Sequence, residues 1–246
     1  MDWAEHRGLL EEGLKALGVA AEPRGVEAVL RHLELVRDWN ERMNLTAITA
    51  PREMVIKHAL DAASGMAALG LEAAQRVIDV GTGAGFPGVV WKCLEPGIDL
   101  TLVESLQKRC RFLEEVGESV VGPLAGRGGY RVVWGRAEDV GRQPEHRERY
   151  DVVTARAVAE LRVLAEYCLP FARVGGRFLA MKGPAVGDEI RAAEAAIAKL
   201  GGELEEVREL DLPEGGGRRS LVLIGKVKPT PAAYPRRAGV PAKSPL

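Results

Sequence analysis

Apolar residues in the first third of the chain recur at intervals of three and four positions. Between residues 26 and 39 these positions are Val26, Val29, Leu30, Leu33, Val36 and Trp39. The spacing is typical of an amphipathic helix that packs one face against a core. Pro51 and the polar residues before it interrupt the pattern, and a second helix is predicted through 54–60. We therefore expect residues 1–74 to form a helical extension.

From Arg76 onward, short apolar runs alternate with helical patterns. Strands are predicted at 77–80, 99–104, 131–134, 150–154 and 176–181, and, after a helix at about 187–200, at 203–211 and 219–227. Pro213 and three glycines between the last two strands indicate a hairpin. The pattern predicts an α/β, Rossmann-like fold with a mostly parallel seven-stranded sheet and a C-terminal antiparallel hairpin. Ligands of such sheets bind at the carboxyl ends of the strands, so the strand ends hold the first candidate residues.

A glycine-rich turn follows the first of these strands, in the segment VIDVGTGAGFPG at 77–88. Glycines let a backbone approach a ligand closely, and the helix start beyond them offers free N–H groups. A dinucleotide fingerprint has a glycine at its sixth position, where this chain has Phe86. With Asp79, the glycines instead form an acidic-x-Gly-x-Gly-x-Gly pattern, which resembles motif I of S-adenosylmethionine-dependent methyltransferases. The candidate cofactor residues here are Asp79, Gly81, Gly83, Gly85 and Phe86.

Two further strand ends carry candidate adenosine contacts. Glu104 ends the second strand, where a carboxylate can accept hydrogen bonds from both ribose hydroxyls, with Ser105 and Leu106 beside the adenosine. The alternative is an ordinary surface carboxylate near a helix start, a helix that Ser105 can cap. After the third strand, the backbone at Ala137 and Glu138 and one carboxylate are candidates for the adenine edge. A helix N-terminus with favourable acidic residues is the alternative there.

Two basic residues stand at the ends of the fourth and fifth strands. Arg156 lies at the end of an apolar strand, where an arginine is costly to desolvate without a polar partner. It either pairs with an acid such as Asp79 or contacts the cofactor or substrate. Lys182 follows the fifth strand at the same rim, although a solvated loop lysine is equally consistent with the sequence. Both are candidates for positioning the reactants.

Two features that are absent from the end of the fourth strand narrow the range of possible methyl-accepting atoms. The sequence there has no Asn/Asp-Pro-Pro-aromatic turn, which activates exocyclic amino groups, and no cysteine for attack on a pyrimidine carbon. Guanine N7 needs neither device, because it has an in-plane lone pair and no proton to lose. Positioning and electrostatics then suffice for catalysis. The sequence is compatible with N7 chemistry without establishing it.

Composition excludes few classes of protein. The net charge of the 246 residues is −1, so any basic surface is local. Three widely spaced cysteines and four scattered histidines indicate neither a disulfide framework nor a metal site, and no signal peptide or long apolar run occurs, so a cytoplasmic protein is expected. Residues 226–246 contain five basic residues, five prolines and no acidic residue. Within this stretch, residues 229–246 form a C-terminal arm. The arm is either a frayed tail or an extended segment that binds phosphate.

Seven segments together resemble the bacterial small-subunit ribosomal RNA guanine-N7 methyltransferases, a family formerly called glucose-inhibited division protein B. They are WNERMNLTAI (39–48) with His58, Leu60 and Asp61, VIDVGTGAGFPG, TLVES with Lys108 and Arg109, GRAED (135–139), TARAV (154–158), GGRFLAMKG (175–183) and YPRRAGVPAKSPL (234–246). The Phe-Pro after the glycines and the YPRR-AG-P-K-PL tail are much more specific than the fold motifs. The resemblance covers almost the whole chain.

The resemblance implies a class I fold whose methyltransferase core is 75–228, S-adenosylmethionine as cofactor, and methylation of guanine N7 at nucleotide 527 of 16S ribosomal RNA. It implies that Gly81 and Phe86 line the cofactor and that Arg156 sits beside it. It also implies that Glu104, Ser105 and Leu106 hold the adenosine and that Ala137 and Glu138 contact the adenine. The basic residues expected to face RNA are Arg136, Lys182, Arg218, Arg219, Arg236 and Arg237. The expected partner is 16S RNA or the small subunit, with no metal and no membrane, and a monomer is expected.

Two other functions stay open at the level of the sequence. The nearly neutral charge also suits a small-molecule methyltransferase on the same fold. A nucleotide-binding regulatory protein without catalysis is the second, because an acceptor pocket cannot be recognised from sequence. Binding of ribosomal RNA with a steep salt dependence favours the RNA methyltransferase over the small-molecule enzyme, and transfer of a labelled methyl group to RNA separates it from the regulatory protein.

Overall fold

The computed structural model describes residues 3–124, 128–156 and 159–246. The N-terminal part is helical, as predicted, and its helices are α1 (Arg7–Ala16), α2 (Pro23–Asn40), α3 (Pro51–Met54), a π-helical turn (Val55–Leu60) and α4 (Asp61–Leu69). Prolines at the first helical positions start α2 and α3, where their missing N–H costs no bond. Gly70, with φ of 58°, ends α4 in the left-handed conformation.

In the described part of the chain, seven strands form one sheet. The strands are β1 (Arg76–Val80), β2 (Asp99–Glu104), β3 (Tyr130–Trp134), β4 (Tyr150–Arg156), β5 (Ala172–Lys182), β6 (Gly202–Leu212) and β7 (Gly217–Lys226). Their order is β3-β2-β1-β4-β5-β7-β6, and β7 is antiparallel to both of its neighbours. This order confirms the predicted mostly parallel sheet with a C-terminal hairpin. The chain reverses direction across the sheet between β1 and β4, which is where such folds bind ligands.

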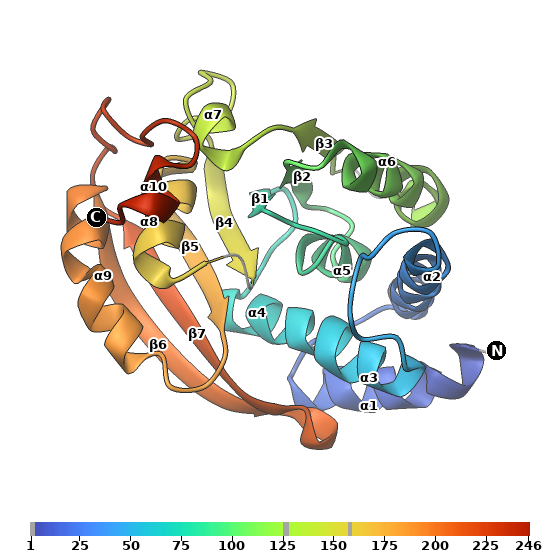
Figure 1. Cartoon of the computed structure of the whole chain (residues 1–246). Coiled ribbons are helices and arrows are strands. Elements are labelled where there is room, and N and C mark those ends of the chain that lie inside the picture. Colours follow the sequence, from blue (N-terminus) through green and yellow to red (C-terminus); the bar gives the residue numbers. More distant parts are fainter. Residues whose placement is uncertain (1–2, 125–127, 157–158) are drawn as a thin grey trace.

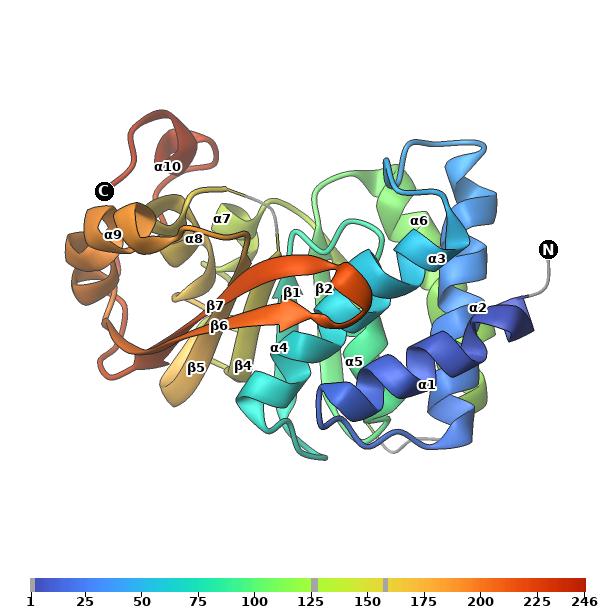
Figure 2. The ribbon, with the colours of Figure 1, turned by 90° about the horizontal axis from the view of Figure 1, so that it is seen from below.

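Helices cover both faces of the sheet (Figures 1 and 2). The connecting helices are α5 (Gly88–Leu94), α6 (Gln107–Val116), α7 (Ala137–Val140), α8 (Leu161–Cys168), α9 (Gly187–Lys199) and α10 (Val240–Lys243). Alternate strand residues supply the two cores, as the two-residue period of a strand requires. Leu100 and Leu102 pack with the N-terminal helices and α5, whereas Ile78 and Val153 pack with α8 and α9. The helical extension therefore shares its core with one face of the sheet.

The C-terminal arm is docked rather than frayed. Arg142 Nε donates to the carbonyl of Pro235 (2.8 Å), and Arg147 donates to the carbonyls of Thr230 (2.7 Å) and Tyr234 (2.8 Å). Backbone carbonyls of a proline-rich segment lack strand or helix partners, so these two arginines satisfy them. The arm ends in α10, which packs against α8 beside the carboxyl ends of the strands.

One smaller prediction is wrong. Ser105 does not cap α6, since Leu106 occupies the cap position and no side-chain cap bond is present there. The Ser105 hydroxyl instead lies 3.4 Å from Glu104 Oε1. The last two residues of the TARAV segment, 157–158, lie outside the described residues.

Candidate active site

The glycine turn after β1 has the left-handed backbone that its sequence predicts. Gly81, Gly83 and Gly85 have φ of 70°, 60° and 89°. A Cβ on Gly83 would enter open space, whereas one on Gly85 would lie 2.5 Å from Val89 Cγ2. Gly83 therefore faces a cavity. Gly85 permits close packing of the turn on α5, and its predicted cofactor contact stays a prediction.

Asp79 supports the turn from behind. Its Oδ2 accepts hydrogen bonds from the Thr82 hydroxyl (2.7 Å) and the Gly88 N–H (2.9 Å). The side chain is fully buried, and burial raises its pKa to about 6. Asp79 is not among the residues that line the cavities at the strand ends. These hydrogen bonds give it the task of fixing the turn, and its predicted contact with the cofactor stays a prediction.

Glu104 faces the same cavity as the glycine turn. Its Oε2 accepts the Gly83 N–H (3.1 Å) and its Oε1 accepts the Leu106 N–H (2.8 Å), while the nearest cation, Arg109 Nη1, is 3.7 Å away. The residue is only 4% exposed. An ionised carboxylate has about four acceptor sites, so Oε2 keeps a lone pair for a further donor such as a ribose hydroxyl, while the second site of Oε1 would be shared with the Ser105 hydroxyl at 3.4 Å.

A second cavity, of about 250 Å³, continues from this one toward the arm. Its lining includes Gly81, Ser105, Ala137, Glu138, Tyr167 and Ala242 of α10. The buried Glu138 carboxylate accepts the Gly239 N–H of the arm (2.8 Å) and lies 3.6 Å from Arg136. Ala137 and Glu138 are therefore at the predicted adenine end, but this carboxylate holds the arm. Leu106 is 54% exposed on the rim, outside the cavity lining.

The rings of Phe86 and His58 form part of the wall of the glycine-turn cavity. The ring of Phe86 stacks on His58, with centroids 4.6 Å apart, and lies 4.7 Å from His32. The guanidinium of Arg156 lies over the same ring at 5.1 Å. Burial lowers the pKa of His32 to about 4, and burial together with Arg156 lowers that of His58 to about 3. Both imidazoles are therefore neutral at pH 7.

Arg156 pairs with an acid, and that acid is Asp61, not Asp79. Arg156 Nη1 donates to Asp61 Oδ2 (3.0 Å) and to the Lys57 carbonyl (3.2 Å), and Arg219 Nε donates to Asp61 Oδ1 (2.9 Å). One buried carboxylate thus lies between two arginines from β4 and β7. Asp61 and His58 belong to the segment that resembled the family, yet sequence reasoning gave neither a role.

A π-helical turn explains how these side chains reach the site. Val55–Leu60 carries Lys57 and His58, and Asp61 follows it at the start of α4. Such turns inside longer helices widen the backbone by one residue and are frequent at functional sites. Pattern reading assumes 3.6 residues per turn, so the only available signal was two polar residues, His58 and Asp61, inside an apolar helix.

The third cavity, of about 350 Å³, opens beyond Arg156. It is lined by Ile48, Lys57, His58, Asp61, Arg156, Met181, Lys182, Gly183 and Arg219. His58 and Arg156 also line the glycine-turn cavity, which in turn shares Gly81 and Ser105 with the adenine end. The three cavities therefore follow one another along the carboxyl ends of the strands.

A family model described as GidB, rRNA small subunit methyltransferase G, matches residues 26–221. The chain belongs to this family. It is 82% identical to ribosomal RNA small subunit methyltransferase G of Symbiobacterium thermophilum over 246 residues, which is all of both chains. It is 49% identical to the protein of the same name from Pelotomaculum thermopropionicum, over 96% of this chain and 97% of that one.

Solved structures agree with the fold of this family member. The crystal structure of precorrin-6y C5,15-methyltransferase from Geobacter metallireducens GS-15 matches with a TM-score of 0.50 at 13% identity, over 67% of this chain and 87% of that chain. At that identity the match shows the fold alone, the class I methyltransferase sheet.

Among the residues that the structure describes, no helix is long and apolar enough to cross a membrane, and no group of side chains could hold a metal ion.

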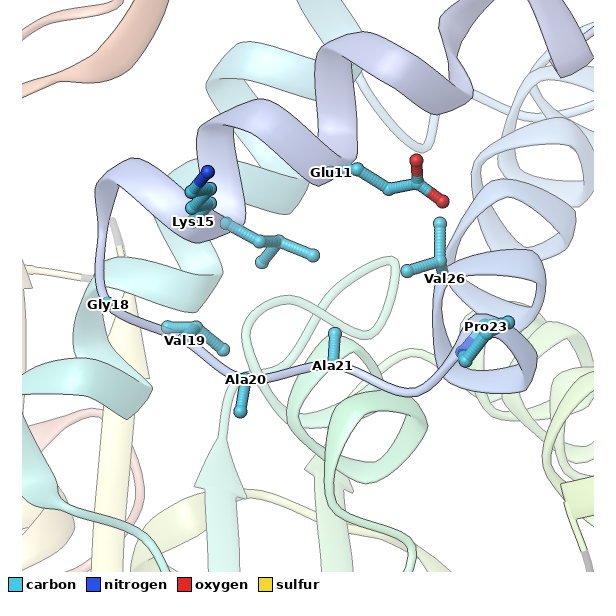
Figure 3. Close-up of a pocket in the computed structure, with 9 residues that line it drawn as sticks. Glu11, Lys15, Gly18, Val19, Ala20, Ala21, Pro23 and Val26 are labelled. Carbon is cyan, nitrogen blue, oxygen red and sulfur yellow. The ribbon is translucent and has the colours of Figure 1, made fainter.

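The strand-end cavities of this methyltransferase G family member fit S-adenosylmethionine. Gly83 leaves an open cradle above the turn, and Glu104 presents free acceptor sites to it. The neighbouring cavity, whose lining includes Ala137 and Tyr167, has a volume of about 250 Å³ for the adenine. A cavity of about 380 Å³ between α1 and α2, drawn in Figure 3, offers no such set, since its lining is mostly aliphatic with Glu11 and Lys15 at the rim.

The basic residues predicted to face RNA form two groups. Lys182, Arg218 and Arg219 lie around the third cavity and the start of β7; Lys182 pairs with Glu189 (2.7 Å) and Arg218 with Asp211 (3.8 Å). Arg136, Arg236 and Arg237 lie near the adenine end.

Arg236 and Arg237 are consecutive but differ in their surroundings. Arg236 makes a bidentate pair with buried Glu166, with Nη2–Oε2 at 2.6 Å, so it anchors the arm instead of pointing freely to solvent. Arg237 is exposed and has no ion-pair partner among the described residues. Of the two, Arg237 is the one whose charge is available to a phosphate.

Proposed function

We propose that this family member transfers the methyl group of S-adenosylmethionine to N7 of guanine at nucleotide 527 of 16S ribosomal RNA. The observation that carries the proposal is the connection between the glycine-turn cavity and the cavity beyond it through Arg156 and His58. A methyl donor on one side and a base on the other would meet at these two residues. Membership of the rRNA small subunit methyltransferase G family supports RNA as the acceptor.

The cofactor-binding residues act by orientation. Glu104 would accept the ribose hydroxyls, the turn at Gly81 and Gly83 would admit the methionine end, and Ser105 and Ala137 would border the adenine. The cofactor supplies an electrophilic methyl group on a positively charged sulfur. Fixing both reactants in line removes the entropy cost of their encounter, which is the main contribution expected when no proton needs to move.

The acceptor side of the site has no general base at work, and N7 requires none. The N7 lone pair forms the new N–C bond while the electron pair of the C–S bond remains on sulfur, so positive charge passes from sulfur to the base. His58, with its pKa lowered to about 3, is neutral and accepts from Arg156 Nη2 (3.4 Å). Asp61 lies in the lining of the acceptor cavity, where Arg156 and Arg219 offset its charge, so positioning of the base is the contribution expected of this side.

The RNA substrate and the cell compartment in which the protein acts are part of the same proposal. Positive charge on both sides of the cavities comes from five side chains, those of Arg219, Arg218, Lys182, Arg136 and Arg237. The proposed substrate is 16S RNA or the small subunit, and the protein is proposed to act in the cytoplasm as a monomer.

Transfer of a labelled methyl group tests this function. Purified protein is incubated with labelled S-adenosylmethionine and small subunits from a strain lacking the gene, and label is expected at guanine 527, detected as N7-specific strand cleavage. Subunits from the parent strain, already modified, serve as the control and should accept almost no label. Absence of label from both preparations would rule the proposal out.

A further inference from the structure

The cavity beyond Arg156 contains a charge arrangement that methyl transfer alone does not require. Asp61 is only 7% exposed, yet each of its oxygens is held by a different arginine at 3.0 Å or less. A buried ion cluster costs desolvation energy unless it is well satisfied or serves a ligand. Asp61 lies in the cavity wall, so its remaining lone pairs face a space of about 350 Å³, the size of a small-ligand pocket.

The donors beside Asp61 are also partly free. Arg219 uses Nε on Asp61 and Nη1 on the Arg218 carbonyl (3.0 Å). Its Nη2 has no partner among the described residues, and the side chain is 21% exposed in the cavity wall. The cavity wall therefore presents one donor, Arg219 Nη2, next to two acceptor oxygens, those of Asp61.

This order complements one edge of guanine. The Watson–Crick edge of guanine presents an acceptor, O6, followed by two donors, N1–H and the N2 amino group. Adenine presents a donor, its amino group, and then an acceptor, N1. Its amino group would therefore face the Arg219 donor, and its N1 lone pair would face the Asp61 carboxylate. Enzymes that act on an extruded base read it by such hydrogen bonds and by stacking on apolar side chains, here Met181 and Ile48.

We propose that Asp61 and Arg219 select guanine, with Asp61 accepting N1–H and the N2 amino group and Arg219 donating to O6. The proposal rests on the function argued above and names the residues that specify its base. N7 is on the other edge of the purine, so these bonds leave its lone pair free to face the methyl group. Arg156 keeps Asp61 oriented from the cofactor side.

Replacing the target guanosine by inosine tests the contact with the N2 amino group, because inosine lacks only that group. Small subunits are reconstituted with 16S RNA carrying guanosine or inosine at the target position, introduced by splinted ligation. Wild-type protein should methylate the guanosine substrate with a kcat/KM about ten- to a hundredfold higher, the range for a hydrogen bond to a charged group. Equal values for the two substrates would overturn the proposal without a variant being needed.

The variant Asp61→Asn tests whether Asp61 is the residue that makes this contact. Its amide keeps the size of the side chain, and its guanosine-to-inosine ratio should fall to near one. If Asp61 only holds Arg156, or only balances charge, methylation of both substrates falls by the same factor and the ratio stays as in the wild type, which contradicts the proposal. Calorimetric binding of S-adenosylmethionine checks that the variant is folded.

The matched pair Arg219→Gln and Arg218→Gln tests the second residue. Each removes one positive charge from the start of β7, but only Arg219 lines the cavity. Arg219→Gln should lower kcat/KM on both RNAs about tenfold more than Arg218→Gln does, and neither should change the ratio. Equal effects of the two variants would remove Arg219 from base recognition. Failure of the wild type to methylate even the guanosine substrate would instead reject the proposed function.

Discussion

Individual carboxylates in this protein differ in task although their sequence contexts look alike. Asp79 is the last but one residue of β1 and Glu104 is the last residue of β2, and each accepts a backbone N–H from the segment that follows β1, Gly88 for Asp79 and Gly83 for Glu104. Asp79 is fully buried behind the turn, whereas Glu104 lines the cavity in front of it. Both side chains emerge on the same face of the sheet, since Asp79 pairs in register with Leu102, two residues before Glu104. The difference lies along the strands, because Asp79 is one residue short of the end of β1 whereas Glu104 is the last residue of β2.

Replacing Glu104 tests its contact with the ribose. Glu104→Gln keeps one acceptor for the Gly83 or Leu106 N–H but loses the charge that strengthens bonds to two hydroxyls. Binding of S-adenosylmethionine should weaken by about 1.5–3 kcal/mol, measured by isothermal calorimetry. Glu114→Gln, an exposed position on α6, is the control and should bind like the wild type. Unchanged affinity of Glu104→Gln would remove the residue from the site.

His32 predicts how the fold responds to acid. Its ring donates to the Ala84 carbonyl (2.8 Å) and is buried, with a pKa lowered to about 4 from 6.5. Between these values the unfolded chain binds the proton and the folded one does not, so stability falls as the pH drops below 6.5 and the loss is complete near 4. From pH 7 to pH 5 the contribution is about 2 kcal/mol.

His32→Gln removes this titration while keeping a donor for the Ala84 carbonyl. Urea unfolding at pH 7 and pH 5 should give a smaller acid loss in the variant than in the wild type, by about 2 kcal/mol. Asp79 titrates in the same range with the opposite sign, because its pKa is raised to about 6, but it does so in both proteins and cancels in the comparison. The same acid loss in both proteins would contradict the assignment.

At the scale of elements, the strands were predictable and the arm was not. Buried parallel strands are short apolar runs, so 77–80 and 99–104 agree with β1 and β2 within one residue. The conformation of the arm depends on Arg142 and Arg147, which contact it from 93 and 87 positions away in the sequence. The π-helical turn likewise depends on tertiary packing around His58, which local periodicity does not contain.

The pair Glu166–Arg236 is expected to hold the arm onto α8. Glu166 is fully buried and accepts three donors of Arg236, including its backbone N–H at 2.8 Å. Glu166→Gln should increase hydrogen exchange across residues 230–243 and lower the free energy of unfolding by about 1–3 kcal/mol. Glu160→Gln, which loses an exposed pair with Arg162, is the control. Unaltered exchange in the arm of Glu166→Gln would mean that the arm is held by other contacts.

At the scale of the whole molecule, a net charge near zero conceals an uneven distribution. The cofactor site could be predicted in outline, because strand order fixes where Glu104 and the glycine turn meet. The acceptor site could not, because Asp61, Arg156 and Arg219 come from α4, β4 and β7 and meet only through the packing of the hairpin on the N-terminal helices. Net charge also could not distinguish arginines that are internally paired from those available to RNA.

Arg237 provides the test of that distinction. It stands next to Arg236 in the arm, but its side chain is exposed and unpaired among the described residues, so Arg237→Gln should leave the fold and cofactor binding unchanged. A phosphate contact releases counterions, so the variant should bind ribosomal RNA more weakly and the slope of log K against log salt should become shallower by about one. Arg31→Gln, a mostly exposed arginine on α2 that pairs with Glu34, serves as a charge-matched control and should keep the wild-type slope. A wild-type slope in Arg237→Gln would mean that the arm contributes to RNA binding only through the shape it gives to the adenine end of the site.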